Sequence, residues 1–151
     1  MEDNNFASVG AIVLRDNKIL LVRHTYGSAK DKLLNPGGMI QQNELPTDAV
    51  KREVLEETGI HINPIGMLSI RCSPKNWYMV FLAEYVSGEV KSDNYENSEA
   101  IFMDSDELLQ RNDATDTVKT LLRLALNKKP IIAQDAGENR ILFASNEDII
   151  N

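Results

Sequence analysis

The chain has 151 residues, of which 42% are hydrophobic and 26% charged, and a formal net charge of −7 at pH 7, values typical of one globular domain. This acidity excludes the basic surface that non-specific nucleic-acid binding requires, and a single cysteine, which we expect to be a half-buried thiol, excludes an internal disulfide framework. The polar, acidic start resembles no signal peptide, and no apolar run approaches the ~18 residues of a membrane span, so we expect a cytoplasmic protein.

The first third of the chain predicts a β-hairpin and then a helix. Residues 8–14 and 19–22 are apolar runs of strand length, and the polar residues 15–18 between them have the composition of a turn. A helix is predicted over 46–58, because proline is favoured at the first helical position and Gly59 suits a left-handed helix end.

The remainder of the chain predicts further strands interrupted by helices. Strands are expected at 67–71, 78–86 and 101–103, a brief helix at 105–109 and an amphipathic helix at 116–127. This order favours a mixed α/β or α+β sandwich. The tail, 128–151, has two short apolar patches around a polar turn, which predict a terminal hairpin.

The helix predicted over 46–58 carries an unusual cluster of carboxylates. Glu53, Glu56 and Glu57 are spaced three and four apart and therefore share one face. Like charges about 5 Å apart repel by roughly 3 kcal/mol at an effective dielectric of ~20, and Arg52 is the only cation placed to offset them locally. Taken alone, the cluster could be a solvated acidic face; the alternative is a site for a hard divalent cation.

The spacing around this cluster extends over a much longer pattern. Gly38, Glu44, Arg52-Glu53, Glu56-Glu57 and Gly59-Ile60 fall at fixed intervals. This resembles the Nudix hydrolase signature, G-x5-E-x7-R-E-U-x-E-E-x-G-U with U a bulky aliphatic residue, at all nine fixed positions. The flanking pattern of strands and helices extends the likeness to roughly residues 8–127.

The resemblance implies a Nudix-type mixed β-sheet sandwiched between α-helices, with a Nudix hydrolase domain at 1–127 and an extension at 128–151 packed on the same domain or on a second subunit. It implies that Mg²⁺, for which Mn²⁺ substitutes, is bound by Glu53, Glu56 and Glu57, with a backbone carbonyl of Gly37 or Gly38 contributing. Arg52 would orient these glutamates, and Glu44 would fix the loop against the helix.

Other residues are candidates for catalysis and substrate binding. Family members often use one more acidic residue from a later loop; Glu96 and Glu99 are the candidates, and we prefer Glu99. Arg23 and Lys32 could meet phosphates and Tyr78 could stack a base, although such basic residues are often only solvated and such aromatics often pack in the core. Many members have Trp and Leu where this chain has Leu33 and Asn35, which weakens assignment to a substrate subfamily.

The implied function is that of a pyrophosphohydrolase. Its substrate would be a small nucleotide-like molecule, either a nucleoside diphosphate linked to another moiety (ADP-ribose or NDP-sugar type) or a nucleoside triphosphate. Pro74 lies near a family marker for ADP-ribose and Tyr78 near one for dinucleoside polyphosphates, and we prefer the nucleoside-diphosphate derivative. The alternative is a catalytically silent Nudix domain that senses a nucleotide or binds a partner. A homodimer is left open.

Overall fold

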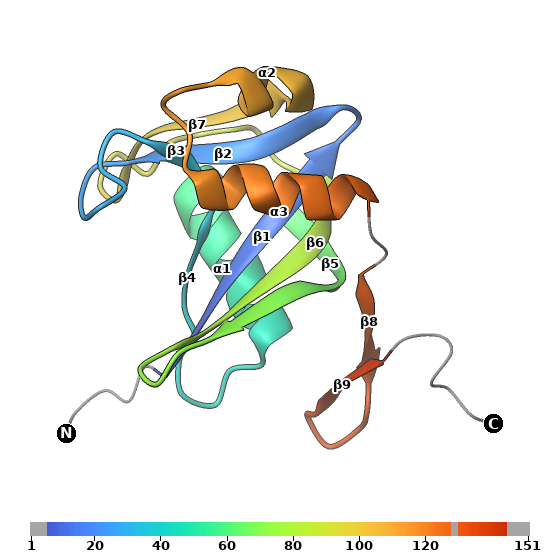
Figure 1. The fold of residues 1–151 in the computed structure, drawn as a ribbon. Helices are drawn as coiled ribbons and strands as arrows, with labels where there is room; N and C mark the ends of the chain where they lie inside the picture. The colour runs from blue at the N-terminus through green and yellow to red at the C-terminus, as the bar shows by residue number, and fades with distance from the viewer. Residues whose placement is uncertain (1–5, 128–129, 145–151) are drawn as a thin grey trace.

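The computed structural model describes residues 6–127 and 130–144, which form a nine-stranded mixed sheet with helices on both faces (Figure 1). The strands are β1 Ala7–Arg15, β2 Lys18–His24, β3 Leu33–Leu34, β4 Gly37–Met39, β5 His61–Cys72, β6 Trp77–Ser87, β7 Asn97–Asp104, β8 Ile131–Asp135 and β9 Ile141–Ala144. The helices are α1 Pro46–Thr58, α2 Ser105–Gln110 and α3 Asp116–Asn127. The predicted sandwich of a mixed sheet between helices is confirmed. None of these helices is long and apolar enough to cross a membrane.

Strand β1 organises the sheet, whose order is β3-β2-β1-β6-β5-β8-β9. It runs parallel to β6 along one edge and shares its other edge between two antiparallel partners. β4 pairs with the start of β1, at Ser8–Gly10, and β2 pairs with its end, at Leu14–Arg15. Between these two pairings the N–H of Ala11 donates to the carbonyl of Pro36 at 3.1 Å. The loop that contains Gly37 and Gly38 is thereby fixed at this divided edge.

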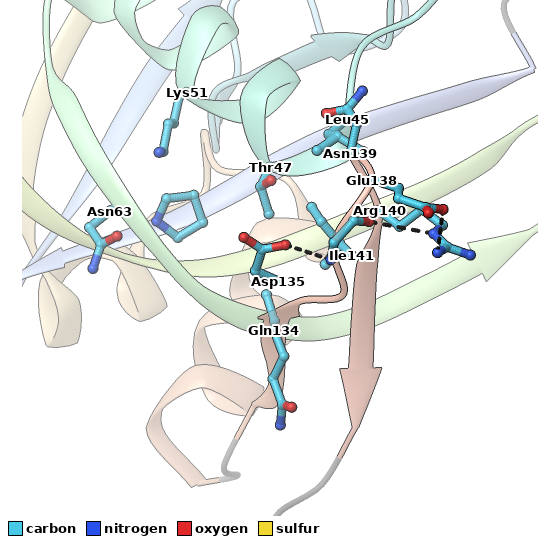
Figure 2. Close-up of a pocket in the computed structure, with 13 residues that line it drawn as sticks. Leu45, Thr47, Lys51, Asn63, Gln134, Asp135, Glu138, Asn139, Arg140 and Ile141 are labelled. Carbon is cyan, nitrogen blue, oxygen red and sulfur yellow. Dashed lines mark hydrogen bonds and ion pairs between the residues drawn. The ribbon is translucent and has the colours of Figure 1, made fainter.

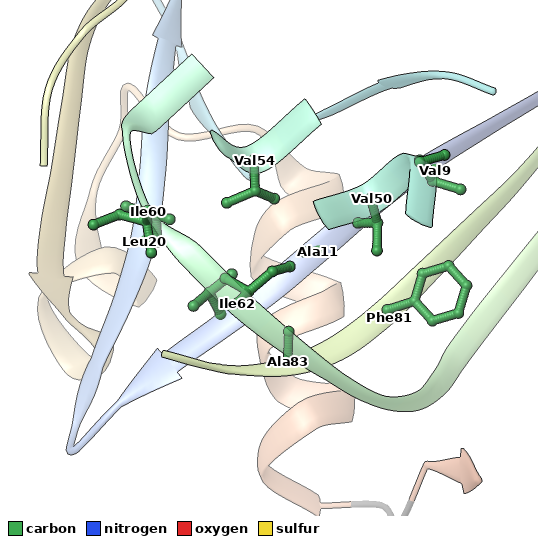
Figure 3. Close-up of a cluster of buried hydrophobic side chains, with 11 residues drawn as sticks. Val9, Ala11, Leu20, Val50, Val54, Ile60, Ile62, Phe81 and Ala83 are labelled. Carbon is green, nitrogen blue, oxygen red and sulfur yellow. The ribbon is translucent and has the colours of Figure 1, made fainter. Parts of the chain in front are cut away.

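Alternation along the central strands divides the core into two layers. Val9, Ala11 and Val13 point toward α1 and pack with its buried face, including Val50 and Val54 (Figure 3). Strand residues of the opposite parity, among them Ile12, Ile19 and Leu21, pack on the other face of the sheet against α2 and α3. The helices contribute Leu108, Val118 and Leu122 to this layer. Because strand side chains alternate between faces, the two layers share one sheet without sharing side chains.

Both ends of α1 follow the sequence prediction. Pro46 stands in the first turn, next to an N-cap, Leu45, whose side chain makes no capping hydrogen bond. Gly59 ends the helix with φ 75°, and its N–H donates to the carbonyl of Leu55 at 2.9 Å. This left-handed residue carries no Cβ penalty. The helix that carries the glutamates is therefore defined at both ends by local sequence.

Several strands differ from the sequence prediction. β3 and β4 were not predicted, because two or three residues are too short to show a period. β5 begins at His61 rather than near residue 67 and includes Pro64, which is accommodated by a register shift beside Gly66. β7 begins at Asn97 rather than at residue 101. Cys72, expected to be half-buried, is exposed, because it lies at the end of β5.

The C-terminal strands form an antiparallel hairpin around Gly137, whose φ is 74°. β8 extends the sheet by pairing with β5 at Gly66–Ile132 and Met67–Ile131. The ring of Phe143 lies 5.8 Å from that of Phe81, which is fully buried under α1. The rest of the extension predicted over 128–151, residues 128–129 and 145–151, lies outside the described residues.

Truncation after Asn127 is expected to lower the thermal stability of the chain. The truncation removes the partner strand of β5 and the ring that packs on Phe81. Phe143→Ala should reproduce part of the loss, about 1–2 kcal/mol for a partly buried aromatic pair. Leu142→Ala on the same strand is the control, because Leu142 is exposed. Calorimetric melting measures the effect; equal melting temperatures for the truncated and full chains would contradict the prediction.

Candidate active site

Helix α1 places three glutamates beside the divided edge of β1, at very different depths. Glu57 is 3% exposed, the side chain of Glu53 is 13% exposed, and that of Glu56 is 57% exposed. The spacing of three and four residues makes them neighbours on one helical face. On this face of the helix, Glu56 is therefore exposed to solvent and the carboxyl group of Glu57 is buried.

Arg52 connects this face to the loop that precedes the helix. Its guanidinium donates two hydrogen bonds to Glu44, from Nε at 2.8 Å and from Nη2 at 2.9 Å. Nη1 donates to Glu53 at 2.8 Å and to Glu56 at 3.3 Å, and Nη2 also donates to the carbonyl of Met39 at 3.0 Å. The bidentate pair lowers the pKa of Glu44 below its ordinary value. Arg52 thus links Glu53 and Glu56 to Glu44 by hydrogen bonds. The orienting role that the resemblance implies for Arg52 stays a prediction.

The two glycines of the loop approach the glutamates directly. The N–H of Gly37 donates to Oε1 of Glu57 at 3.4 Å. The carboxylate of Glu53 lies against Gly38, where a Cβ atom would come within 2.3–2.5 Å of its three terminal atoms. A side chain at position 38 would occupy the space of the carboxylate. The structure therefore explains why a glycine stands at this position.

Among the described residues, the most deeply buried of these carboxyl groups, that of Glu57, has no ion-pair partner. Burial raises the pKa of Glu57 to about 9, and the nearby carboxylates of Glu53, Glu96 and Asp93 add to this, against a small lowering by the Gly37 N–H. Burial also raises the pKa of Glu53, although Arg52 opposes the shift. No Lys, Arg or His of the described residues forms an ion pair with Glu57.

This donor set fits a hard divalent cation. Oxygen ligands from one or two carboxylates, completed by water and phosphate, are what Mg²⁺ prefers in nucleotide enzymes, and a cation would stabilise the ionised form of Glu57. In the part of the chain that the structure describes, no three Asp, Glu, His or Cys side chains are yet arranged to hold a metal ion. Arg52 engages Glu53 and Glu56, so these two side chains would have to share or leave that partner to bind a metal.

The raised pKa of Glu57 predicts a pH-dependent stability in metal-free buffer. The folded protein binds a proton at Glu57 between the ordinary glutamate pKa near 4.5 and about 9, whereas the unfolded chain does not. Stability should therefore be highest below pH 4.5, as far as this group is concerned, and fall as pH rises toward 9. In Glu57→Gln, chemical denaturation between pH 5 and pH 9 should show a smaller decline; identical slopes for both proteins would contradict the assignment.

A cavity of about 490 Å³ opens beside the glycine loop. It extends from Gly38 across β1 and β6 to the end of β5, and residues at the start of α3 close one side. Its lining residues are Ser8, Val9, His24, Tyr26, Ser28, Ala29, Leu34, Asn35, Gly37, Gly38, Met39, Arg71, Tyr78, Thr115 and Thr117. The rings of His24 and Tyr26 stack at 5.1 Å. The carboxylates of Glu57 and Glu53 contribute to raising the pKa of Tyr26, after burial and Glu96. Because Gly38 lines the cavity and lies against the carboxylate of Glu53, the cavity adjoins the carboxylates.

The fold and this cluster of glutamates match a known family. The family model for the NUDIX domain matches residues 4–124. The chain belongs to the NUDIX domain family.

The chain is also similar to individual relatives and to a solved structure. The chain is 32% identical over 107 residues to an ADP-ribose pyrophosphatase from Methanocaldococcus jannaschii, covering 67% of this chain and 63% of the relative. It is 35% identical over 98 residues to the NAD-capped RNA hydrolase NudC from Vibrio parahaemolyticus, covering 63% and 37%. A NUDIX hydrolase structure from Nitrosomonas europaea superposes with a TM-score of 0.74 at 21% identity, covering 86% of this chain and 77% of that one. The chain thus spans less than two-thirds of the length of both sequence relatives.

Within the NUDIX domain, the structure separates the two candidates for a further acidic residue. Glu99, which we preferred from the sequence, lies opposite Arg23 on the neighbouring strand and pairs with it at 3.8 Å. Glu96 instead acts on the glutamate cluster, because its charge contributes to the raised pKa of both Glu53 and Glu57. Glu96 is therefore the candidate with an electrostatic link to the cluster. The preference for Glu99 rested on its place just before residues 101–103, and the role of either residue stays a prediction.

The three predicted substrate contacts are placed unequally. Tyr78 lines the cavity, and its hydroxyl accepts a hydrogen bond from Asn35 Nδ2 at 2.9 Å. Arg23 pairs with Asp113 at 3.1 Å and donates to the carbonyl of Asp31, and neither it nor the exposed Lys32 lines the cavity. Contact of Arg23 and Lys32 with substrate therefore stays a prediction without geometric support.

Arg71 was not predicted as a site residue from the sequence, but it lines the cavity. Its guanidinium lies 5.3 Å from the centre of the Tyr78 ring. Pairing of β5 with β6 places Arg71 directly opposite Tyr78. The alternation of β5 could have indicated which face Arg71 occupies, but not which residue stands opposite it, because the register shifts within β5 are not visible in the sequence.

A second cavity, of about 550 Å³, lies away from the glutamates of the NUDIX signature (Figure 2). It is enclosed by the start of α1, by Asn63 and Pro64 of β5 and by the C-terminal hairpin. Its charged groups are largely used locally: Asp135 accepts from the N–H of Gly137 at 2.8 Å, and Arg140 pairs with Glu138 at 2.8 Å. This second cavity is thus separate from the glutamate cluster.

Proposed function

We propose that this chain is a hydrolase that cleaves a phosphoanhydride bond, using Mg²⁺ or Mn²⁺, in a nucleoside diphosphate linked to another moiety. The observation that carries the proposal is the buried, uncompensated carboxyl group of Glu57 beside Glu53 and the Gly37–Gly38 loop. Such a group is costly to the fold unless a cation accompanies it. The ADP-ribose pyrophosphatase among the relatives supports the choice of substrate class.

Glu53, Glu56 and Glu57 would hold the metal. When bound, a divalent metal neutralises phosphoryl oxygens and lowers the pKa of a coordinated water. Arg52 orients Glu53 and Glu56 through its hydrogen bonds, and Glu44 fixes Arg52 in turn. The glycine at position 38 leaves room for the carboxylate of Glu53 to lie against the loop backbone.

Other residues would complete the reaction. Glu96, whose charge contributes to the raised pKa of Glu53 and Glu57, would accept a proton from the attacking water. The cavity beside the loop would hold the part of the substrate that is not cleaved. Its aromatic pair, His24 and Tyr26, offers a ring face for a nucleobase.

A panel of nucleotides tests this function. ADP-ribose, an NDP-sugar or a nucleoside triphosphate should be hydrolysed with Mg²⁺ or Mn²⁺, and turnover should stop with a chelator. AMP and nitrophenyl phosphate should stay nearly untouched, because a phosphomonoester has no second phosphate and a poor leaving group. In heavy-oxygen water the label should enter a phosphoryl product; label on a ribose carbon, or turnover that resists the chelator, would refute the mechanism. Binding of ADP-ribose without turnover would instead support a nucleotide sensor.

A further inference from the structure

The cavity beside the proposed catalytic loop crosses four neighbouring strands at one level. Met39 of β4 lies opposite Ser8 of β1, Ser8 lies opposite Tyr78 of β6, and Tyr78 lies opposite Arg71 of β5. Side chains at paired positions point to the same face of a sheet. The row therefore leads from the glycine loop at one end to Arg71 at the other.

The length of this row places Arg71 beyond the bond to be cleaved. Neighbouring strands are about 4.8 Å apart, and the guanidinium of Arg71 lies over the ring of Tyr78, two strands from β4. Its separation from the loop is thus roughly 10 Å. That is about the reach of a nucleoside, so Arg71 faces the remote part of a substrate whose phosphoanhydride lies at the glutamates.

The charge at this end of the cavity is positive and not neutralised. The lining contains no Asp or Glu, although the chain as a whole carries −7. Burial lowers the pKa of His24, so this ring is neutral near pH 7 and Arg71 is the cation of the cavity. Within the described residues Arg23, Arg52, Arg111 and Arg140 have carboxylate partners, whereas Arg15, Arg71 and Arg123 form no such ion pair. Of these three, Arg71 is the one that lines the cavity.

The surroundings of Arg71 hold it in place and leave its donors available. The guanidinium stacks on Tyr78, whose hydroxyl is in turn fixed by Asn35. Stacking orders the flexible side chain and leaves its N–H groups at the edge. Thr115, whose hydroxyl accepts a hydrogen bond from the N–H of Val118, and Thr117 line the same cavity. Planar guanidinium with hydroxyl donors is the combination that binds phosphate.

We propose that Arg71 is a specificity-determining residue, which selects substrates that carry a phosphate monoester on the nucleoside, away from the phosphoanhydride that is cleaved. The inference rests on the proposed function for its turnover but not for its binding. An adenosine with a 2′- or 3′-phosphate has the required shape. Arg71 binds this phosphate and takes no part in the chemistry, so its loss should act on affinity and KM rather than on kcat.

Binding to the full chain tests the inference without turnover. Calorimetric titration in Mg²⁺ should give adenosine 2′,5′-bisphosphate or adenosine 3′,5′-bisphosphate an affinity at least about tenfold above that of 5′-AMP, as expected for a charge-assisted contact. Arg71→Met should abolish the difference and Arg71→Lys should retain part of it. The matched control is Arg123→Met, which removes the same charge from an exposed site on α3. Equal affinities in the unmodified protein, no binding of either bisphosphate, or a difference that survives in Arg71→Met would overturn the inference.

Turnover separates this inference from the proposed function. NADPH and CoA differ from NADH and dephospho-CoA by one such phosphate each. With at least one of these pairs, the phosphorylated member should have the higher kcat/KM, through KM, and Arg71→Met should remove the preference. Hydrolysis of both members at equal efficiency would overturn the role of Arg71 and leave the hydrolase intact. Tenfold tighter bisphosphate binding without hydrolysis of any nucleotide would do the reverse.

Discussion

Glu57→Gln is expected to reduce hydrolysis of a phosphoanhydride substrate by two orders of magnitude or more, at saturating Mg²⁺, while the fold is retained. Glutamine keeps the size of the side chain and its contact with the Gly37 N–H but removes the charge that would bind a metal. Because the buried carboxyl group strains the metal-free fold, the same variant should melt at an equal or higher temperature near pH 8. Steady-state kinetics and calorimetry measure the two effects.

A second variant in the site and a control variant outside it test this result further. Glu56→Gln should also lower the rate strongly, although Glu56 is exposed and contributes little to stability. Glu84→Gln removes a charge from an exposed position on β6, outside the site, and should leave the rate within a few-fold. Near-normal turnover by both Glu56→Gln and Glu57→Gln would show that the metal site lies elsewhere.

Alanine substitutions at Gly37 and Gly38 are expected to separate catalysis from folding. In Gly38→Ala the new Cβ would displace the carboxylate of Glu53, which Arg52 holds, so activity should fall by at least about tenfold with a small change in stability. In Gly37→Ala the Cβ would meet the backbone of β1, 2.3 Å from the carbonyl oxygen of Val9 and 2.8 Å from Cα of Gly10. Backbone cannot yield as a side-chain end can, so stability should fall by about 1–3 kcal/mol or more.

Paired assays of melting and turnover decide this prediction. Gly38→Ala should melt near the unmodified chain and turn over slowly, whereas Gly37→Ala should melt lower. Gly27→Ala is a control for backbone strain alone, because Gly27 has a positive φ of 73° and open space around it. Full activity of Gly38→Ala would mean that the contact between Glu53 and Gly38 is not part of the working site.

The parts of the site that depend on local sequence were predictable, and those that depend on register were not. The ends of α1 follow from Pro46 and Gly59, and the shared face of its glutamates follows from helical periodicity. The different exposures of Glu53, Glu56 and Glu57 depend on which side of α1 meets β4, and no local sequence pattern predicts that side. Likewise, β7 begins earlier than the sequence predicts, and the place of Arg71 depends on bulges in β5.

The division of the interior into two side-chain layers has a consequence for how such a chain can diverge. The glutamates belong to the helix that covers one face of the sheet, whereas Tyr78 packs with the layer on the opposite face and Thr115 and Thr117 lie where α3 begins. Substitutions in separate layers combine almost additively, because they share few contacts. Ligand preference can therefore change through the α3 layer while the packing beneath α1 stays as it is, which allows one reaction to be inherited across lineages that meet different metabolites.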